Sequence, residues 1–207
     1  MGNPFVHDVF VREGILITAL WNDGITFRDL GGAGSGSVSN PVRLGGVATV
    51  GGEAHNVWWY HDVLGQKKYV FVGEEGPGAI GSFSSGDIHV IDASNFAAPM
   101  EVAFYHLNGA GTHNFSVDES RGILYAAYYN GGVRAINVNG DLSSCSATAR
   151  SPDGRCDLAR MGRELAHGLG DSGKVYVWGV QFIDGSVYAS DMLSGLWKLR
   201  EAPPPAN

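Results

Sequence analysis

"THNFSVDESRGILYAAYYNGGVRAINV" (residues 112–138) begins beside a histidine, passes through two apolar segments and turns at a pair of glycines. The N-terminal stretch "HDVFVREGILITALWNDGITFRDL" (7–30) follows the same plan. Within the two, "GILITALWNDGI" aligns with "GILYAAYYNGGV" without a gap. A match of this length inside one chain indicates an internal repeat, which decides the fold before any local signal does.

Two further segments extend the repeat to four units. Residues 178–200 align with the first stretch, with Trp178 in the place of His7, and residues 55–93 follow the plan with a longer insertion before Gly86. Each unit contains three expected strands, and segments that begin at a proline add a fourth strand to two of the units. Four antiparallel strands per unit predict an all-β propeller of four blade-like units in a single domain, residues 1–200. The expected units are residues 5–50, 54–107, 112–170 and 174–200.

The last two units depart from the plan. In the third, a cysteine loop and "DLARMGRELAHGL" (157–169) predict a short helix in place of a fourth strand. The last unit offers no outer strand, because the proline-rich tail 201–207 is expected to be disordered. An open propeller edge invites pairing with another chain. The alternatives are therefore a compact four-bladed ring with an incomplete last blade, half of a dimeric ring, or the C-terminal part of a larger propeller.

Composition supports an all-β protein and excludes several partners. The 207 residues include 31 glycines and only 17% charged residues, which is typical of short strands joined by tight turns. A net charge of -7 lacks the basic surface that nucleic acid or an anionic membrane requires, and no apolar run is long enough for a membrane helix. Cys145 and Cys156 lie in one polar loop, where a local disulfide and an oxidising compartment are favoured over two free thiols.

Several motifs resemble those of a known family. "HNVWWYHD", "YVFVGEEG", "GDIHVIDAS", "THNFSVDE" and "YVWGVQFIDGSVYASDMLSGLWKL" are similar to segments of the LVIVD-repeat proteins, which are bacterial secreted or surface-associated β-propellers. The resemblance covers residues 5–200. It implies an extracellular, periplasmic or cell-surface location and a match to the C-terminal half of a longer member, but it implies no established reaction.

Histidines recur at one position of the repeat. His7, His55 and His113 head the strand that should be innermost in three successive units, so they should converge on the central channel. Neutral imidazoles are good ligands for zinc, which we expect first, and for iron or copper, with calcium a further alternative. Three protein ligands with an open position are typical of a catalytic metal site. The alternative is a fold signature in which each imidazole bonds to a backbone carbonyl of the next blade.

Acidic and aromatic residues add candidates around the expected channel. Glu74, Glu75 and Asp191 lie near the ends of second strands, where each could act as a base or a further metal ligand. Trp21, Tyr129 and Trp178 are expected near one channel mouth, where aromatic rings suit a sugar or another flat ligand. His89 alternates with apolar neighbours and is therefore expected on the solvent face of its strand.

These observations favour a metal-dependent hydrolase that acts on an ester or phosphoester of a small molecule. The first alternative is a non-catalytic scaffold that binds protein or carbohydrate through its channel-mouth loops. The second is an iron- or copper-dependent oxidoreductase. In each case a homodimer formed through the open propeller edge is expected.

Overall fold

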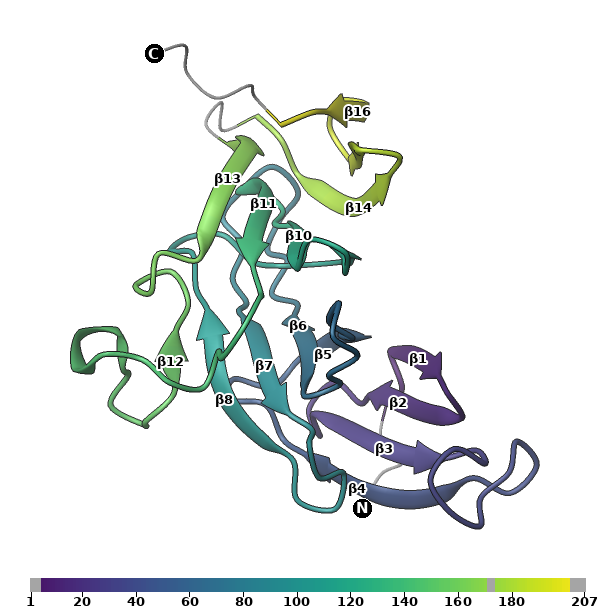
Figure 1. Cartoon of the computed structure of the whole chain (residues 1–207). Coiled ribbons are helices and arrows are strands. Elements are labelled where there is room, and N and C mark those ends of the chain that lie inside the picture. Colours follow the sequence, from purple (N-terminus) through teal and green to yellow (C-terminus); the bar gives the residue numbers. More distant parts are fainter. Residues whose placement is uncertain (1–4, 171–173, 202–207) are drawn as a thin grey trace.

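A computed structural model describes residues 5–170 and 174–201, and it consists of four antiparallel β-sheets that follow one another along the chain (Figure 1). Each sheet corresponds to one repeat unit, here called units 1 to 4. The strands are β1 (Asp8–Arg12), β2 (Ile15–Ala19), β3 (Ile25–Asp29) and β4 (Val42–Val47) in unit 1; β5 (Ala54–Trp59), β6 (Tyr69–Glu74), β7 (Ile88–Asp92) and β8 (Met100–Tyr105) in unit 2; β9 (Phe115–Asp118), β10 (Ile123–Ala127), β11 (Gly132–Asn137) and β13 (Glu164–Leu169) in unit 3; and β14 (Val177–Ile183), β15 (Ser186–Asp191) and β16 (Gly195–Leu199) in unit 4.

Turn chemistry explains why each unit folds back on itself. Glu13 and Gly14 both have positive φ between β1 and β2, as do Asp184 and Gly185 between β14 and β15, which is the backbone that a two-residue hairpin turn needs. At the end of β3, the Asp29 carboxylate accepts hydrogen bonds from three backbone N–H groups of the next loop. Asp29 is therefore a structural turn residue.

The hydrophobic core lies between the units. One cluster joins units 1 and 2 around Phe27 and Val72, a second joins units 2 and 3 around Phe71 and Leu124, and a third joins units 3 and 4. Each sheet therefore buries its faces against its neighbours in the chain, as the blades of a propeller do.

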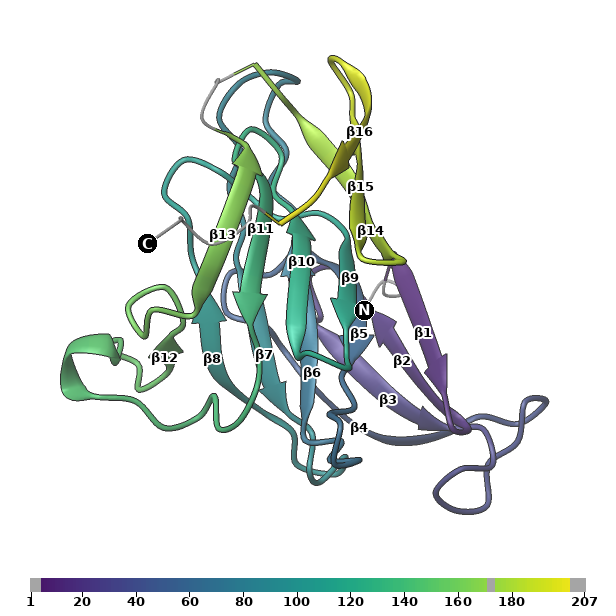
Figure 2. The same cartoon turned by 45° about the horizontal axis from the view of Figure 1, so that its top comes forward.

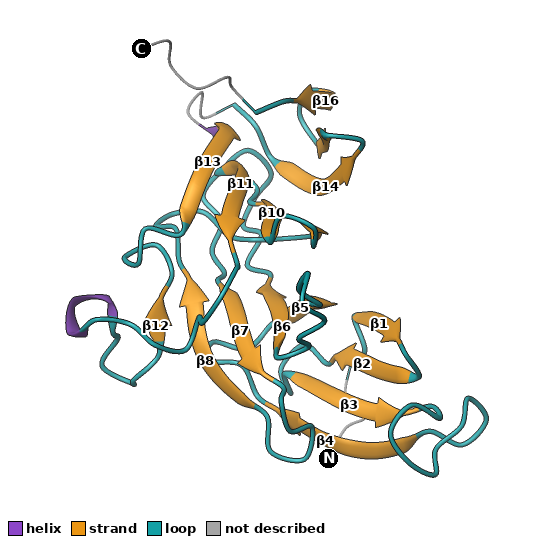
Figure 3. Ribbon diagram, viewed as in Figure 1, coloured by secondary structure: helices purple, strands orange, loops and turns teal. Residues whose placement is uncertain are grey.

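Unit 3 has a fourth strand, and the helix expected within residues 157–169 is wrong. Glu164 to Leu169 form β13, which pairs with β11. Glu164 bonds Tyr105 and Arg134, which holds this segment against the sheet despite its helix-forming residues. Figure 3 shows a helical turn, η1 (Ala147–Ala149), in the preceding loop. There the Cys145–Cys156 disulfide is present, and β12 (Cys156–Asp157) adds a parallel strand to β8.

The four sheets form an arc, with β1 at one end and β14 to β16 at the other (Figures 1 and 2). Among the described residues no strand pairing joins β1 to unit 4, and unit 4 has three strands. The predicted all-β propeller of four units with an incomplete last blade is confirmed. Residues 202–207 of the expected tail lie outside the described part. Within the described ranges no helix is long and apolar enough to cross a membrane.

Candidate metal site in the channel

The inner edge of the arc brings the repeated histidines together. His7 precedes β1, His55 lies in β5 and His113 precedes β9. The ring centroids of His7 and His55 lie 4.2 Å apart, and those of His55 and His113 lie 4.0 Å apart. The repeat therefore stacks three imidazoles along the inside of three successive units, as their equivalent positions predict.

A carboxylate lies in the middle of this row. Glu75 Oε2 is 3.3 Å from His55 Nε2 and 3.9 Å from His7 Nε2, and Glu75 Oε1 is 3.6 Å from His113 Nε2. One ligand atom each from His7, His55 and Glu75 lie within 4.8 Å of one another, so these three residues can hold one metal ion. The structure thus adds Glu75 to the histidines and groups it with two of them.

The tautomer of His7 leaves a lone pair facing Glu75. His7 Nδ1 lies 3.1 Å from the backbone carbonyl of His55, to which it donates. In the neutral ring Nε2 is then the nitrogen with the lone pair, and this is the atom on the Glu75 side. A backbone bond of this kind commonly orients a metal-binding histidine. His7 therefore makes the carbonyl contact of the structural alternative and still offers a ligand atom.

His113 is held differently from the other two. The indole N–H of Trp178 donates to His113 Nε2, which occupies the lone pair that faces Glu75. Tyr129 donates its hydroxyl proton to Glu75 Oε1 and so fixes the carboxylate, leaving Oε2 toward His7 and His55. His113, Trp178 and Tyr129 therefore lie around the group formed by His7, His55 and Glu75.

Burial keeps the inner imidazoles neutral. Burial, reinforced by the neighbouring His7, lowers the pKa of His55 to about 4. Burial and the neighbouring His55 lower the pKa of His113 to about 3. Burial, together with the Glu75 carboxylate that accepts its proton, raises the pKa of Tyr129 above its ordinary range. At neutral pH His55 and His113 are therefore uncharged, and Tyr129 stays a hydrogen-bond donor.

The repeat itself explains why Glu75 reaches the channel. Trp21, Glu75 and Tyr129 each come six residues after the first residue of the second strand of their unit, and Met192 has this position in unit 4. Only in unit 2 is the residue acidic. Alignment of the four second strands therefore separates Glu75 from Glu74, two candidates that otherwise look alike in sequence.

Glu74 and Asp191 have their carboxylates away from the channel. Glu74 precedes Glu75 and points to the other side, where Oε2 accepts from the Asp87 N–H at 3.0 Å. Asp191 Oδ1 accepts from the Tyr176 N–H at 2.6 Å, and Oδ2 accepts from Ser194, which closes the turn before β16. Neither carboxylate joins the group of His7, His55 and Glu75.

His89 is fully buried, so its expected place on the solvent face of β7 is wrong. Its Nδ1 lies 2.9 Å from Glu101 Oε1 and its Nε2 lies 3.4 Å from Glu74 Oε2. Burial alone would lower the pKa of His89, but the two carboxylates outweigh it and raise the pKa to about 9. Arg155 also pairs with Glu101. Alternation failed here because the side chains of Glu74, Glu101 and Arg155, the last from the disulfide loop, gather around His89 on this face.

Two cavities meet at Glu75. One, of about 310 Å³, is lined by the three histidines, Glu75 and Trp178. The other, of about 550 Å³, lies at the channel mouth and is lined by Glu75 together with Trp21, Glu53, Pro77, Phe83 and Ser85. The Glu75 carboxylate is therefore reached from both.

The predicted mouth aromatics serve different purposes. The Trp21 ring packs 5.0 Å from His7, and Tyr129 is buried with its hydroxyl on Glu75. Trp178 is exposed and bonds His113. Each of the three rings therefore contacts a different residue of the site: His7, Glu75 or His113.

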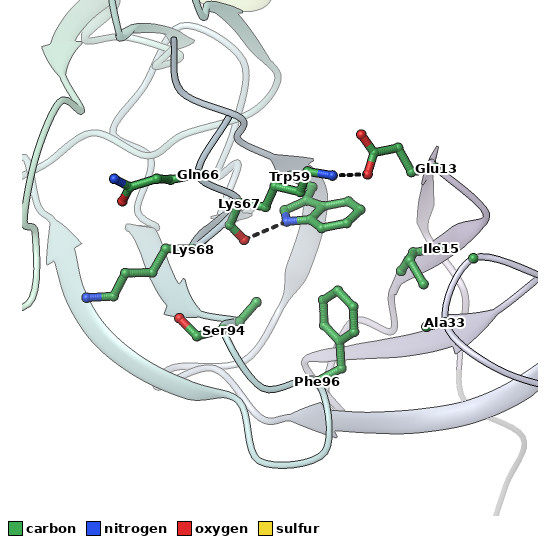
Figure 4. A pocket seen from close by; sticks show the side chains of 11 residues that line it. Glu13, Ile15, Ala33, Trp59, Gln66, Lys67, Lys68, Ser94 and Phe96 are labelled. Atoms are coloured by element: carbon green, nitrogen blue, oxygen red, sulfur yellow. Dashed lines mark hydrogen bonds and ion pairs between the residues drawn. The ribbon is translucent and has the colours of Figure 1, made fainter. Parts of the chain in front are cut away.

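A third cavity, of about 530 Å³, lies at the opposite end of units 1 and 2 (Figure 4). Trp59 and Phe96 line it, the Trp59 indole N–H donates to the Lys67 carbonyl at 3.0 Å, and a Lys67–Glu13 ion pair lies beside the ring. Lys67 lowers the pKa of Glu13. No group of metal-binding side chains was found among the described residues at this end.

Comparison with known proteins supports the propeller fold but gives no information about the candidate metal site. No family model matches the sequence, and no curated protein matches it. The computationally designed Ika4 protein is similar over 98% of this chain and 100% of its own, with a TM-score of 0.55 and 12% identity.

Two natural propellers are also similar. The C-terminal WD40 domain of Sif2 matches over 95% of this chain and 46% of its own, with a TM-score of 0.59 and 10% identity. The Cps50 (Swd1) β-propeller domain of Myceliophteria thermophila matches over 95% and 54%, with a TM-score of 0.58 and 8% identity. The chain thus spans about half the length of these two propellers. At such identities the similarity concerns the fold alone.

Proposed function

We propose that this propeller binds a divalent metal, zinc first, through His7, His55 and Glu75, and uses it to hydrolyse an ester or phosphoester. The observation that carries the proposal is the approach of one ligand atom each of His7, His55 and Glu75 to within 4.8 Å of one another. Two histidines and one glutamate form a ligand set of catalytic zinc sites.

The spacing of these atoms suits a tetrahedral ion. Zinc ligands at about 2.0–2.2 Å from the metal lie roughly 3.3–3.5 Å from one another. The separations of 3.3 Å and 3.9 Å between the imidazole nitrogens and Glu75 Oε2 are close to this distance between ligand atoms. Small side-chain adjustments would bring all three atoms to bonding distance.

The surrounding residues have defined roles in this proposal. A metal with an open coordination position lowers the pKa of a bound water toward neutrality, which is what hydrolysis requires. Tyr129 holds the Glu75 carboxylate through Oε1, and the His55 carbonyl holds His7 through Nδ1. The 550 Å³ cavity beyond Glu75 offers room for a small-molecule substrate.

The mouth cavity also supports the second candidate, a non-catalytic scaffold that binds protein or carbohydrate. We infer for either case an LVIVD-repeat propeller that works outside the cytoplasm, since the Cys145–Cys156 disulfide suits an oxidising compartment. A bound iron or copper in place of zinc would favour the oxidoreductase alternative.

Metal content after extensive dialysis tests the proposal. Elemental mass spectrometry of the zinc-loaded protein should give about one equivalent of metal, and His55→Ala and Glu75→Gln should each abolish stoichiometric binding because each removes a ligand. His106→Ala is the matched control, since His106 is exposed and pairs with Asp87 at 2.6 Å. It should keep the metal.

Metal that stays in both ligand variants, or that never binds the unmodified protein, would overturn the metal site. Bound zinc without turnover of ester or phosphoester substrates would overturn the hydrolase and leave a metal-stabilised scaffold. Circular dichroism of each variant confirms that the fold is intact before metal is measured.

A further inference from the structure

The innermost strands differ in burial between the middle and the ends of the arc. In unit 3, β9 is buried along its whole length, and β5 in unit 2 is nearly so. In unit 1, β1 alternates between half-buried and exposed positions, and β14 in unit 4 has exposed positions along one face. Equivalent strands thus bury two faces in the middle units and leave one open at the ends.

On unit 1 the open face is the one that packs on a preceding unit. Val9 occupies the register position of Val57, Phe115 and Val180, each opposite an equivalent residue of the second strand. Val9 is 55% exposed, whereas these three counterparts are 3%, 7% and 5% exposed. The counterparts belong to core clusters shared with the unit before them.

On unit 4 the open face is the one that packs on a following unit. Leu196 occupies the register position of Ile25, Ile88 and Val133 at the start of the third strand. Leu196 is 74% exposed, whereas the three counterparts are 0%, 1% and 4% exposed. Each counterpart belongs to a cluster shared with the unit after it.

The two open faces therefore complement each other as successive blades do. Unit 1 lacks a preceding unit and unit 4 lacks a following one among the described residues. Their apolar side chains, Val9 and Val11 on one and Leu196 on the other, occupy positions that pack together between neighbouring units. Exposed apolar patches of this kind mark interaction sites.

We propose that a second copy of this chain closes the ring, with unit 4 of each copy packed on unit 1 of the other. A two-fold axis satisfies both open faces at once, which a closed symmetric dimer requires. The two natural propellers matched here are about twice as long as the aligned chain, so a ring of two such arcs has the span of known propellers.

Closure of the ring by a second copy would also complete the channel. Neighbouring residues of the histidine row contact one another, as His113 and Trp178 do with ring centroids 5.2 Å apart. By the repeat, Trp178 of a second copy would lie beside His7, whose side chain is the most exposed of the three histidines. The dimer would then cover the open side of the candidate metal site.

Size-exclusion chromatography with light scattering tests the dimer at micromolar concentrations. The unmodified chain should have twice its 21.9 kDa mass. Val9→Asp and Leu196→Asp should each give monomers, because a carboxylate would be buried in both interfaces of the ring. Val38→Asp is the matched control: Val38 is exposed in the loop after β3, and the variant should stay dimeric.

A monomer from the unmodified chain would overturn the proposal and point to further blades of a longer polypeptide as the occupant of both faces. A dimer that survives both face variants would overturn the interface. Hydrogen exchange gives a readout that needs no variant: β1 and β16 should gain protection with rising concentration. Metal content is measured separately, so failure of the dimer and failure of the metal site are distinguishable.

Discussion

The middle units and the end units are built from one repeat but are held together differently. Units 2 and 3 have neighbours on both sides, and their inner strands are buried on both faces. Units 1 and 4 keep apolar residues at the same positions without covering them. A repeat therefore specifies inter-blade faces whether or not a neighbour is present, and exposure at the ends identifies where the next blade belongs.

The contrast extends to charge. On the third and fourth strands of the middle units, His89 pairs with Glu101 and Arg134 pairs with Glu164, at equivalent register positions. The corresponding residue is Thr26 in unit 1, which bonds Thr18 at 2.7 Å, and Trp197 in unit 4. At this position the two middle units have ion pairs, and a hydroxyl or an aromatic group replaces them in the end units.

The largest expected effect comes from breaking the ion pair of unit 2. Glu101→Gln leaves a buried His89 imidazolium without its principal partner, so the free energy of unfolding should fall by about 3 to 5 kcal/mol. Urea denaturation measures this loss. Glu13→Gln, which removes an exposed pair between Glu13 of unit 1 and Lys67 of unit 2, should leave the urea midpoint almost unchanged. Equal losses in the two variants would erase the contrast.

The next effect compares two aliphatic residues at one register position. Ile88→Ala opens a cavity in the middle of the core and should cost about 2 to 5 kcal/mol. Leu196→Ala removes an exposed side chain and should cost less than about 0.5 kcal/mol in a monomeric Val9→Asp background. In the unmodified background the same change should weaken the dimer. A large loss from Leu196→Ala in the monomer would show that unit 4 is covered within one chain.

The stability of the protein should also depend on pH, and this effect should be smaller and more gradual. The carboxylates of Glu101 and Glu74 raise the pKa of His89 above its ordinary 6.5 to about 9. The positively charged Arg155, which pairs with Glu101, is the other charged group beside them. The contribution of His89 to stability is therefore fully present below pH 6.5 and is lost as pH rises through about 9. Urea midpoints should fall over this range and stay flatter in Glu101→Gln. A flat profile in the unmodified protein would contradict the buried imidazolium.

The fold could be predicted because the repeat carries it. The alignment of residues 7–30 with 113–138, which is gapless over 14–25 and 122–133, predicted the order of three strands per unit without any tertiary information. β13 was missed because "GRELAHGL" favours a helix locally, whereas the pairing with β11 and the bonds from Tyr105 and Arg134 to Glu164 come from distant parts of the chain.

The candidate site could be predicted only in outline. Equivalent positions brought His7, His55 and His113 to one place, because repeated residues converge when repeated units form an arc. Alignment of the four second strands separates Glu75 from Glu74, whereas the hydrogen bond from Trp178 to His113 depends on the packing of unit 4 on unit 3. That contact leaves no local signal in the sequence.

The most direct test of the proposed metal site is anomalous diffraction at the zinc edge from crystals of the zinc-loaded protein. The account predicts one peak bonded to His7 Nε2, His55 Nε2 and Glu75, with His113 Nε2 still bonded to Trp178. A peak held by His113 instead of Glu75, or no peak within the channel, would contradict it.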